Sequence, residues 1–407
     1  MRVLIINAIY GSRSSGRSIA EIRNELQMSG HTVYVATPSV TNEPGFYRIG
    51  NKFDHKFHAF ASRIIGLQGY FSYLATLQFI KYIDKINPDI IHIQVIHGNY
   101  INFKMLMEYI SRKQIPVVFV LDDCWFFTGK CCHYIAAQCF KWKSQCTECP
   151  RKKDDNPSWF FDFSKKMYTD KKRLFSYLDR YAIVAVSEWL KNEAKQSFLK
   201  NASILTRIYN AIDMDKFYYR KDCIELKRKL GLEDKKIVLG VATAWDDSNG
   251  LSKGLNLFVQ LAELLPDEFE IILVGKMKNI AMLPSKIRSI DFVEGTDLLA
   301  QYYSISDVFV QMSSEETFGK VTAEALACGT PCIVFDSTAN PELIGEKCGF
   351  VVENKNIKQV YERILDIINN GKEYYSSSCR QFALSNFESR ENARQYIELY
   401  KKLIDEV

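Results

Sequence analysis

The sequence predicts an α/β protein built from two doubly wound, Rossmann-like domains, each a parallel sheet with helices on both faces. Short, wholly apolar runs alternate with amphipathic helical stretches through both halves of the 407-residue chain. Strands that are apolar throughout are typical of parallel sheets buried on both faces. The length also exceeds what one hydrophobic core usually holds, which favours two domains.

The first half begins with an apolar strand in RVLIINA, a glycine-containing loop in GSRSSGRS, and a helix that ends at Gly30. Further strands are predicted in HTVYVAT, PDIIHIQV, IPVVFVLDD and RYAIVAVS, with a helix around FKMLMEYISRK. We therefore expect an N-terminal domain over residues 1–207, with a cysteine-rich insertion at 124–150.

The second half repeats this alternation. Strands are predicted in KKIVLGVAT, FEIILVG, IDFVEG, DVFVQMS and TPCIVFD, and helices in GLNLFVQLAELL, DLLAQYYSIS and VTAEALAC. We expect a second domain over residues 208–385. Residues 386–407 read as an amphipathic helix that packs back toward the N-terminal domain, with Tyr396, Leu399, Tyr400 and Leu403 on one face.

Charge and hydropathy narrow the class of protein. The net charge of +5 is too small for a polycationic nucleic-acid protein, so no nucleic-acid partner is expected. No run of about 18 apolar residues indicates a spanning helix, and the N-terminus lacks the pattern of a signal peptide. These features predict a cytoplasmic protein whose cysteines are reduced.

One basic segment lies beside aromatic residues. Lys165, Lys166, Lys171, Lys172 and Arg173 follow Trp159, Phe160, Phe161 and Phe163. This pattern is typical of a contact with an anionic membrane surface, which would place the protein peripherally on the inner face of the plasma membrane. A solvated helix face explains the same charges equally well.

The stretch SSEETFGKVTAEALACGTPCIVFD, residues 313–336, carries the strongest functional signal. It predicts a loop after a strand, a helix that starts near Lys320, and a turn at Gly329 and Pro331. A loop at this end of a parallel sheet, followed by the N-terminus of a helix, favours a bound phosphate. Glu316 and Glu324 could then accept hydrogen bonds from hydroxyl groups. A glutamate pair on its own would more simply be a loop charge and a solvated helix residue.

This stretch resembles the E-x7-E signature of glycosyltransferase family 4, the large retaining family with the GT-B fold. NPELI at 340–344 matches the family's following loop. Three upstream segments match as well, although Ala211 stands where the family usually has glycine. The matching residues are Asn210, Ile212, Asp213 and Phe217, then Lys253 and Gly254, then Leu298, Tyr303 and Asp307.

The first half resembles a branch of family 4 found in bacterial polysaccharide gene clusters. Asp123, Cys124, Trp125, Thr128, Gly129 and Cys131 match that branch. Asp122 stands where the branch usually has a histidine that contacts the donor sugar. Asp122 could take over a hydroxyl contact, and His97 is then the remaining histidine candidate beside the reaction centre.

The resemblance implies a retaining hexosyltransferase that uses a nucleotide diphosphate sugar and needs no catalytic metal. The expected acceptor is a saccharide hydroxyl of a lipid-linked oligosaccharide for cell-surface polysaccharide, bound on the N-terminal domain. Departure of the diphosphate is the hard step, and fixed positive charge aimed at it lowers the barrier. The implied catalytic residues are Asp122, Lys253 and Glu316, and the implied donor-binding residues are Gly16, Arg17, His97, Gly254, Leu298, Phe318, Gly319, Lys320 and Glu324.

Four cysteines form a cluster with a C-x-x-C pair at one end. Cys131, Cys139, Cys146 and Cys149 have seven, six and two residues between them. In a reducing compartment such a set favours a structural zinc site with four thiolate ligands. Free buried thiols and disulfides are the alternatives at this point.

Two other functions remain open from the sequence. A GT-B-like nucleotide-sugar epimerase would need no acceptor. A zinc-ribbon protein that binds nucleic acid would use the cysteines and the basic segment but would leave Lys253, Glu316 and Glu324 unexplained. A Rossmann oxidoreductase is disfavoured because neither half opens with G-x-G-x-x-G.

Overall fold

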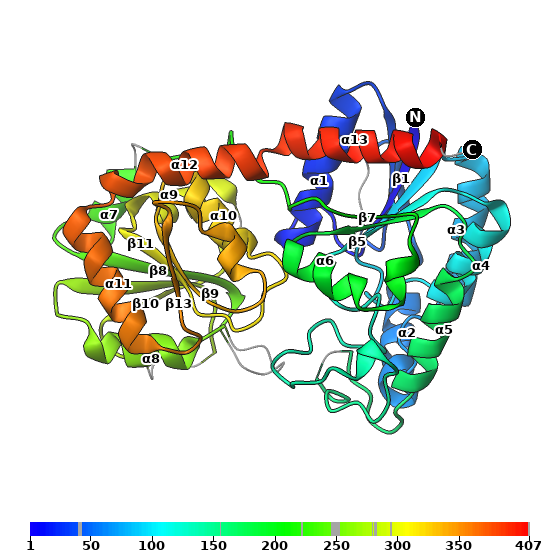
Figure 1. Cartoon of the computed structure of the whole chain (residues 1–407), viewed down its shortest axis with the longest axis horizontal. Helices are drawn as coiled ribbons and strands as arrows, with labels where there is room; N and C mark the ends of the chain where they lie inside the picture. The colour runs from blue at the N-terminus through cyan, green and yellow to red at the C-terminus, as the bar shows by residue number, and fades with distance from the viewer. Residues whose placement is uncertain are drawn as a thin grey trace. The chain divides into compact units, whose positions relative to one another are not determined.

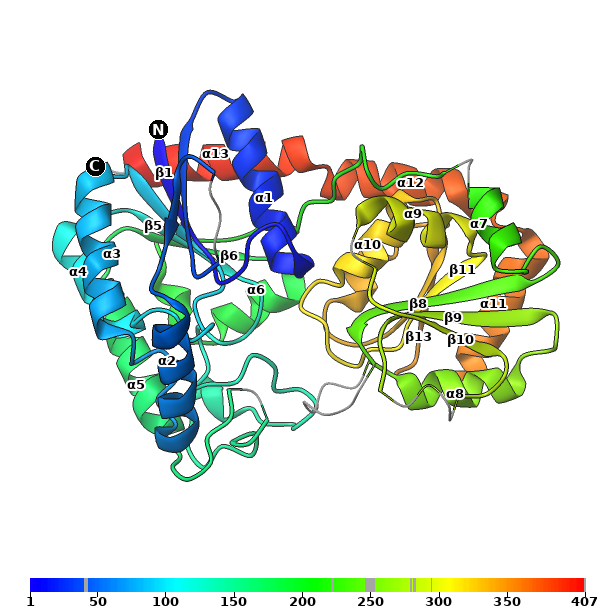
Figure 2. The same cartoon turned by 180° about the vertical axis from the view of Figure 1, so that it is seen from behind.

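The computed structural model describes residues 1–39, 43–154, 156–220, 223–245, 253–278, 280, 283–293 and 295–405. The chain forms two compact units, shown in Figures 1 and 2. The first unit comprises Met1–Tyr209 and Arg390–Val407, and the second comprises Asn210–Ser389. The C-terminal segment thus belongs to the first unit, and the second unit begins at Asn210, two residues after the expected start at 208.

The first unit has a seven-stranded sheet in the order β3-β2-β1-β4-β5-β6-β7, and every neighbouring pair is parallel. Strands β1, β4, β5 and β6 consist of apolar residues apart from Arg2 and His92, and almost all their side chains are buried, as expected for strands covered on both faces. The bounds are β1 Arg2–Ile6, β2 Thr32–Thr37, β3 Phe46–Arg48, β4 Ile90–Ile93, β5 Val117–Leu121, β6 Tyr181–Ala185 and β7 Ile204–Arg207.

Seven helices surround this sheet among the described residues (Figure 2). They are α1 Arg13–Met28, α2 Lys52–Ile65, α3 Tyr73–Ile86, α4 Phe103–Lys113, α5 Ser164–Phe175, α6 Glu188–Lys195 and α13 Ser389–Asp405. Helix α13 packs its apolar face on the sheet, as the spacing of Tyr396, Leu399, Tyr400 and Leu403 predicts. Tyr400 also bonds His92 of β4, with 2.6 Å between its hydroxyl oxygen and Nδ1.

The second unit has a six-stranded parallel sheet in the order β10-β9-β8-β11-β12-β13. The bounds are β8 Lys236–Ala244, β9 Phe269–Lys276, β10 Ile287–Ile290, β11 Val308–Gln311, β12 Cys332–Phe335 and β13 Gly349–Val352. The helices are α7 Cys223–Lys229, α8 Leu255–Leu264, α9 Thr296–Ile305, α10 Lys320–Ala327, α11 Ile357–Asn370 and α12 Glu373–Phe387. Both sheets therefore have the doubly wound strand order, which confirms the predicted fold class.

Some local predictions are wrong. The strand expected in IDFVEG lies earlier, at β10 Ile287–Ile290, so residues 291–293 follow the strand. Helix α1 already begins at Arg13, so Gly16 lies inside a helix and not in the expected glycine-containing loop. The short strands β3, β7 and β13 were missed because their side chains are half-exposed and give no continuous apolar run.

Candidate functional site

The strand order indicates where a ligand of the second unit would be expected to bind. The order of the strands reverses about the neighbours β8 and β11, and ligands bind outside the carboxyl ends of strands at such a point. The first described residue after β8 and Trp245 is Lys253, and the loop after β11 carries Glu316. The preceding part of the DSNGLSKGL motif, residues 247–252, lies outside the described residues.

Lys253 and Glu316 form an ion pair at this point. The distance from Nζ of Lys253 to Oε1 of Glu316 is 2.5 Å, and Nε2 of Gln311 donates to the same oxygen at 2.8 Å. The Lys253 side chain is 31% exposed and that of Glu316 is 16% exposed. The two side chains are therefore held close together but are partly exposed. An anionic ligand could replace Glu316 as the partner of Lys253.

Gly254 brings the two loops together. A Cβ atom at Gly254 would lie 2.6 Å from Cβ of Met312 and 2.7 Å from its carbonyl oxygen, and the glycine has φ of +85°. Only glycine allows both the left-handed backbone and this close approach. The contact holds the start of α8 against the end of β11, which positions Lys253 beside Glu316.

The loop from Ser313 to Gly319 ends at the N-terminus of α10. Gly319 caps this helix with φ of +93° and no side-chain cap, so the first helix amides and the helix dipole face the loop. Side chains of the following segment fix the loop, since Thr338 Oγ1 accepts from the Glu316 amide at 2.9 Å and Asn340 Nδ2 donates to the Ser313 carbonyl at 3.0 Å. This geometry suits an anion that carries several oxygens.

The second glutamate of the signature is fully buried. Glu324 has 0% exposure and accepts a hydrogen bond of 3.1 Å from the Tyr303 hydroxyl. The interpretation of Glu324 as a solvated helix residue is therefore wrong. Its contact with a ribose diol stays a prediction.

The other candidates in the second unit differ in exposure. Leu298 on α9 is 42% exposed, whereas Lys320 is buried at the start of α10. Phe318 is also buried and packs edge-to-face on Phe387, so its backbone is the part that a ligand could reach.

The first unit places another polar group at the ends of β4 and β5. Nε2 of His97 lies 2.7 Å from Oδ2 of Asp123, and Cys132 Sγ lies 3.8 Å from the same nitrogen. Burial raises the pKa of Asp123, but the His97 ring and the Trp125 amide outweigh burial and hold the pKa below its ordinary value. The carboxylate therefore fixes the orientation of the His97 ring.

Asp122 has a separate partner, because its Oδ2 accepts a hydrogen bond of 2.6 Å from Gln94 Nε2. Gly16 and Arg17 lie on α1 in the first turns of the helix. Asp122, His97, Gly16 and Arg17 thus belong to the first unit, while Lys253, Glu316 and Glu324 belong to the second.

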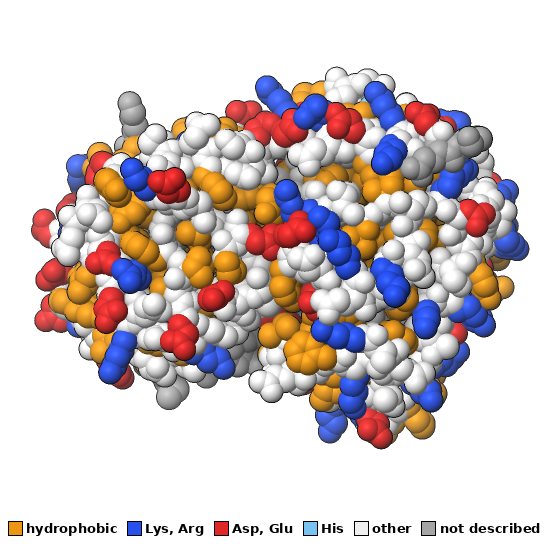
Figure 3. Space-filling model, viewed as in Figure 1, with side chains coloured by type: hydrophobic (Ala, Val, Ile, Leu, Met, Phe, Trp, Pro, Cys, Tyr) orange, Lys and Arg blue, Asp and Glu red, His pale blue; other side chains and the backbone are white. Residues whose placement is uncertain are grey.

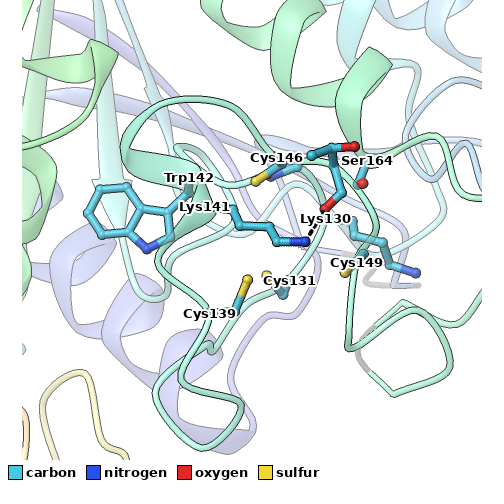
Figure 4. Close-up of a pocket in the computed structure, with 10 residues that line it drawn as sticks. Lys130, Cys131, Cys139, Lys141, Trp142, Cys146, Cys149 and Ser164 are labelled. Atoms are coloured by element: carbon cyan, nitrogen blue, oxygen red, sulfur yellow. Dashed lines mark hydrogen bonds between the residues drawn. The ribbon is translucent and has the colours of Figure 1, made fainter.

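All eleven cysteines are free thiols, and the four of the cluster line one small cavity (Figure 4). We call it the thiol cavity. Its volume of about 10 Å³ is about the smallest that holds one water molecule. Cys131, Cys139, Cys146 and Cys149 share its lining with Gly129, Lys130, Lys141, Trp142, Thr147 and Ser164.

Lys171, which the sequence pattern grouped with the basic surface, is buried beside this cavity. Its Nζ donates to the carbonyl oxygens of Trp125 at 2.5 Å and Thr128 at 3.2 Å, and it lies 3.3 Å from the centre of the Trp125 ring. Burial lowers the pKa of Lys171 to about 7, while nearby thiols and Asp123 oppose this shift. Lys171 therefore cannot contribute to a membrane contact.

Sequence reasoning missed three functional candidates. Asp123 stood in the matched motif beside Asp122, but only the fold pairs it with His97. Gln311 was visible as a polar residue at the end of an apolar strand. Lys171 had no signal that separated it from its exposed neighbours Lys172 and Arg173.

The two doubly wound units, with polar groups after the carboxyl ends of their strands, define a two-domain α/β protein. The family model described as Glycosyltransferase Family 4 matches residues 15–216, and the model of the glycosyl transferases group 1 matches residues 222–383. The chain belongs to the family 4 glycosyltransferases, and its fold is the GT-B combination of two Rossmann-like domains.

Named relatives are distant. The chain is 28% identical to spore coat protein SA of Bacillus subtilis over 54% of this chain and 64% of that protein. It is 24% identical to the N-acetyl-alpha-D-glucosaminyl L-malate synthase of Bacillus anthracis, over 54% of this chain and 58% of that protein. These matches span less than two thirds of either relative. A match to the alpha-monoglucosyldiacylglycerol synthase of Acholeplasma laidlawii is 23% identical and covers 94% of this chain and 97% of that protein.

Solved structures support the fold along the whole chain. Sucrose-phosphate synthase of Thermosynechococcus elongatus superimposes with a TM-score of 0.70 at 16% identity, covering 99% of this chain and 98% of that chain. Anabaena HepE in complex with UDP and glucose gives a TM-score of 0.68 at 15% identity, covering 99% of this chain and 100% of that chain. At these identities the likeness concerns the fold alone.

Proposed function

We propose that this protein is a retaining glycosyltransferase that moves a hexose from a nucleotide diphosphate sugar to a hydroxyl of a saccharide acceptor. The Lys253–Glu316 pair at the β8/β11 crossover point of the second unit carries the proposal. It combines a cation for a diphosphate with a carboxylate for sugar hydroxyls. The UDP and glucose in the Anabaena HepE structure support a donor of this class.

Each residue of the second unit then has a chemical role. Lys253 leaves Glu316 for the diphosphate and stabilises the negative charge that develops as the glycosidic phosphate bond breaks. The amides at the start of α10 add donors to the same oxygens. Glu316, with Gln311, accepts from sugar hydroxyls, and Glu324 accepts from the ribose diol.

In the first unit, Asp122 and His97 provide the polar contacts to the transferred sugar and to the acceptor hydroxyl. His97 is oriented by Asp123, which restricts the ring to one direction of hydrogen bonding. In the retaining mechanism of the family, the departing phosphate removes the acceptor proton, so no side-chain nucleophile is required.

The acceptor is a lipid-linked oligosaccharide at an anionic membrane. Support comes from an exposed aromatic surface on the first unit, consisting of Phe53, Phe57, Phe60, Trp159, Phe160 and Phe161, all at least half exposed. Phe60 and Trp159 are 6.4 Å apart, and the Trp159 amide donates to the Arg63 carbonyl at 2.6 Å, so the two segments are adjacent. Exposed apolar patches of this kind mark interaction sites.

Basic residues accompany the aromatic surface. Lys52, Lys56 and Lys165 are exposed next to it, which suits anionic headgroups. On the face drawn in Figure 3, blue Lys and Arg side chains also lie among hydrophobic patches of the first unit. No helix among the described residues is long and apolar enough to cross a bilayer.

Product analysis tests the proposed reaction. The protein is incubated with UDP-, GDP- and ADP-hexoses and a lipid-diphosphate saccharide, and products are analysed by mass spectrometry and anomeric NMR. We expect the acceptor to gain one hexose with the donor's anomeric configuration. An epimerised donor without transfer would instead identify an epimerase, and an inverted linkage would refute retention.

Liposome flotation tests the membrane contact. We expect association with vesicles that contain phosphatidylglycerol and weaker association with phosphatidylcholine alone. The variant with Phe57→Ser and Phe60→Ser should lose binding, whereas Tyr219→Ser with Ile224→Ser, exposed residues of the second unit, should retain it. No flotation, together with equal transfer to a soluble sugar, would refute the membrane contact.

A further inference from the structure

Gln94 and Asp122 follow two neighbouring strands of the first sheet. Gln94 comes directly after β4, and its backbone amide donates to the Ile6 carbonyl of β1 at 3.1 Å, so Gln94 still belongs to the sheet. Asp122 comes directly after β5. The parallel register pairs Ile93 with Phe119, so Asp122 lies two residues beyond the position opposite Gln94. Because alternate residues of a strand share a face, the two side chains lie on the same face of the sheet.

One short hydrogen bond joins the two side chains. Nε2 of Gln94 donates to Oδ2 of Asp122 at 2.6 Å. Gln94 is 2% exposed, whereas Asp122 is partly exposed. Buried amides need hydrogen-bond partners, and a bond to an ionised carboxylate is among the stronger ones. The bond therefore ties a carboxylate that a ligand could reach to a buried anchor.

Helix α13 packs on the face that carries Gln94. His92 lies two residues before Gln94 and so shares its face of the sheet. Nδ1 of His92 is 2.6 Å from the Tyr400 hydroxyl, and the rings of His92 and Tyr396 are 5.3 Å apart. Burial raises the pKa of Tyr396, and the negative charge of Asp122 adds to this shift, so Asp122 also lies near α13. This packing explains why Gln94 is buried.

We propose that Gln94 is a positioning residue, which holds the Asp122 carboxylate in one orientation toward a hydroxyl of the bound sugar. The inference rests on the proposed role of Asp122 in the transferase reaction. An ionised carboxylate only accepts hydrogen bonds, and it has room for more than one donor. Asp122 can therefore accept from Gln94 and from a ligand hydroxyl together. Gln94 acts through Asp122 and is not a catalytic residue.

Two variants displace or remove the donor. Gln94→Asn keeps an amide on a side chain that is one methylene shorter, and Gln94→Leu has a similar size without the amide. Both should lower kcat by about 10- to 100-fold, because a displacement of about 1 Å near the reacting atoms can cost about 10²-fold. Nucleotide affinity, measured by isothermal titration calorimetry, should stay unchanged, since Lys253 belongs to the second unit.

A control variant separates positioning from lost stability. Thr76 is fully buried in the first unit, and its Oγ1 accepts from the Asn102 amide at 2.8 Å. Thr76→Val removes this bond without touching Asp122. Its urea unfolding midpoint should fall as in the Gln94 variants, while its kcat stays at the wild-type value. An equal loss of kcat in Thr76→Val would show that Gln94 acts through stability alone and would overturn the proposal.

Gln94→Glu gives a pH profile that a purely structural role would not produce. A protonated glutamic acid can donate to Asp122 in place of the amide, whereas an ionised one repels it. The ratio of kcat in Gln94→Glu to kcat in the wild type should therefore fall as the pH rises. His92, Tyr396 and Tyr400 pack beside the pair in both proteins, so the ratio isolates the new carboxyl group. A ratio that does not depend on pH would contradict the proposal.

The kinetic series also distinguishes this inference from the proposed function. A wild-type protein that transfers no sugar from any donor would refute the proposed function and this inference with it. An active wild type whose kcat is matched by Gln94→Asn and Gln94→Leu would refute the role of Gln94 alone.

Discussion

The ammonium nitrogen of Lys253 lies 2.5 Å from the Glu316 carboxylate, and the two residues are 63 positions apart in the sequence. They follow the two strands at which the second sheet reverses its order, and Gly254 packed on Met312 holds their loops together. The pair is therefore a consequence of the fold. The pair places a cation where negative charge would develop on a departing diphosphate.

Lys253→Met should abolish most turnover while leaving the protein folded. The Lys253 side chain is partly exposed, so its loss costs little stability, but removal of one charge-stabilising group typically lowers kcat by about 10²–10³-fold. Steady-state kinetics with the active donor checks this. Lys229→Met, an exposed lysine on α7, is the control and should behave as wild type.

Glu324→Gln should separate ligand binding from folding. The amide oxygen of glutamine can still accept from Tyr303, so the free energy of unfolding should stay close to wild type. Glu324→Ala leaves a buried hydroxyl without this acceptor and should cost about 1–3 kcal/mol. Urea unfolding measures both variants. If Glu324→Gln also binds nucleotide sugar as wild type does, then Glu324 has only a structural role.

Gly254→Ala should lower thermal stability and nucleotide affinity more than the same change at Gly231, another glycine with a left-handed backbone. At Gly231, φ is +67° and an added Cβ would meet no neighbour within 4 Å, so alanine there meets backbone strain of about 1–2 kcal/mol only. At Gly254 the added methyl also collides with Met312. Thermal stability and nucleotide affinity should both fall further in Gly254→Ala. Equal effects at the two sites would refute the close-approach argument.

Acid should destabilise the first unit through His92. Burial lowers the pKa of His92 to about 4, whereas the unfolded chain keeps the ordinary value near 6.5. Between these two pKa values the unfolded state binds more protons than the folded state. The free energy of unfolding therefore falls as the pH falls, and at pH 5 it is about 2 kcal/mol lower than at pH 7.

The His92→Gln variant tests this contribution. It should unfold with a shallower pH dependence between pH 7 and pH 5 in urea titrations. The His58 pKa, lowered to about 3 by burial, acts in the same direction in both proteins and therefore cancels. Parallel pH profiles for wild type and variant would contradict a role for His92 in acid destabilisation.

Much of the fold could be predicted because the central strands are continuously apolar, as in β5 and β12, and buried parallel sheets require this pattern. Lys253 and the roles of the two candidate glutamates followed from the resemblance to family 4. What could not be predicted depends on long-range packing: the Lys253–Glu316 ion pair, the His97–Asp123 pair, and the burial of Glu324. Lys171 is the plainest case, since a buried lysine and a solvated lysine look alike in a basic run.

We propose that the second unit binds a nucleotide diphosphate at Lys253 and the start of α10. Isothermal titration of the wild-type protein and of Lys253→Met with UDP, GDP and ADP tests this claim. One nucleotide should bind the wild type, with affinity reduced at least about tenfold in the variant, as expected for loss of a charge-assisted contact. Binding of no nucleotide, or equal binding by both proteins, would contradict the claim.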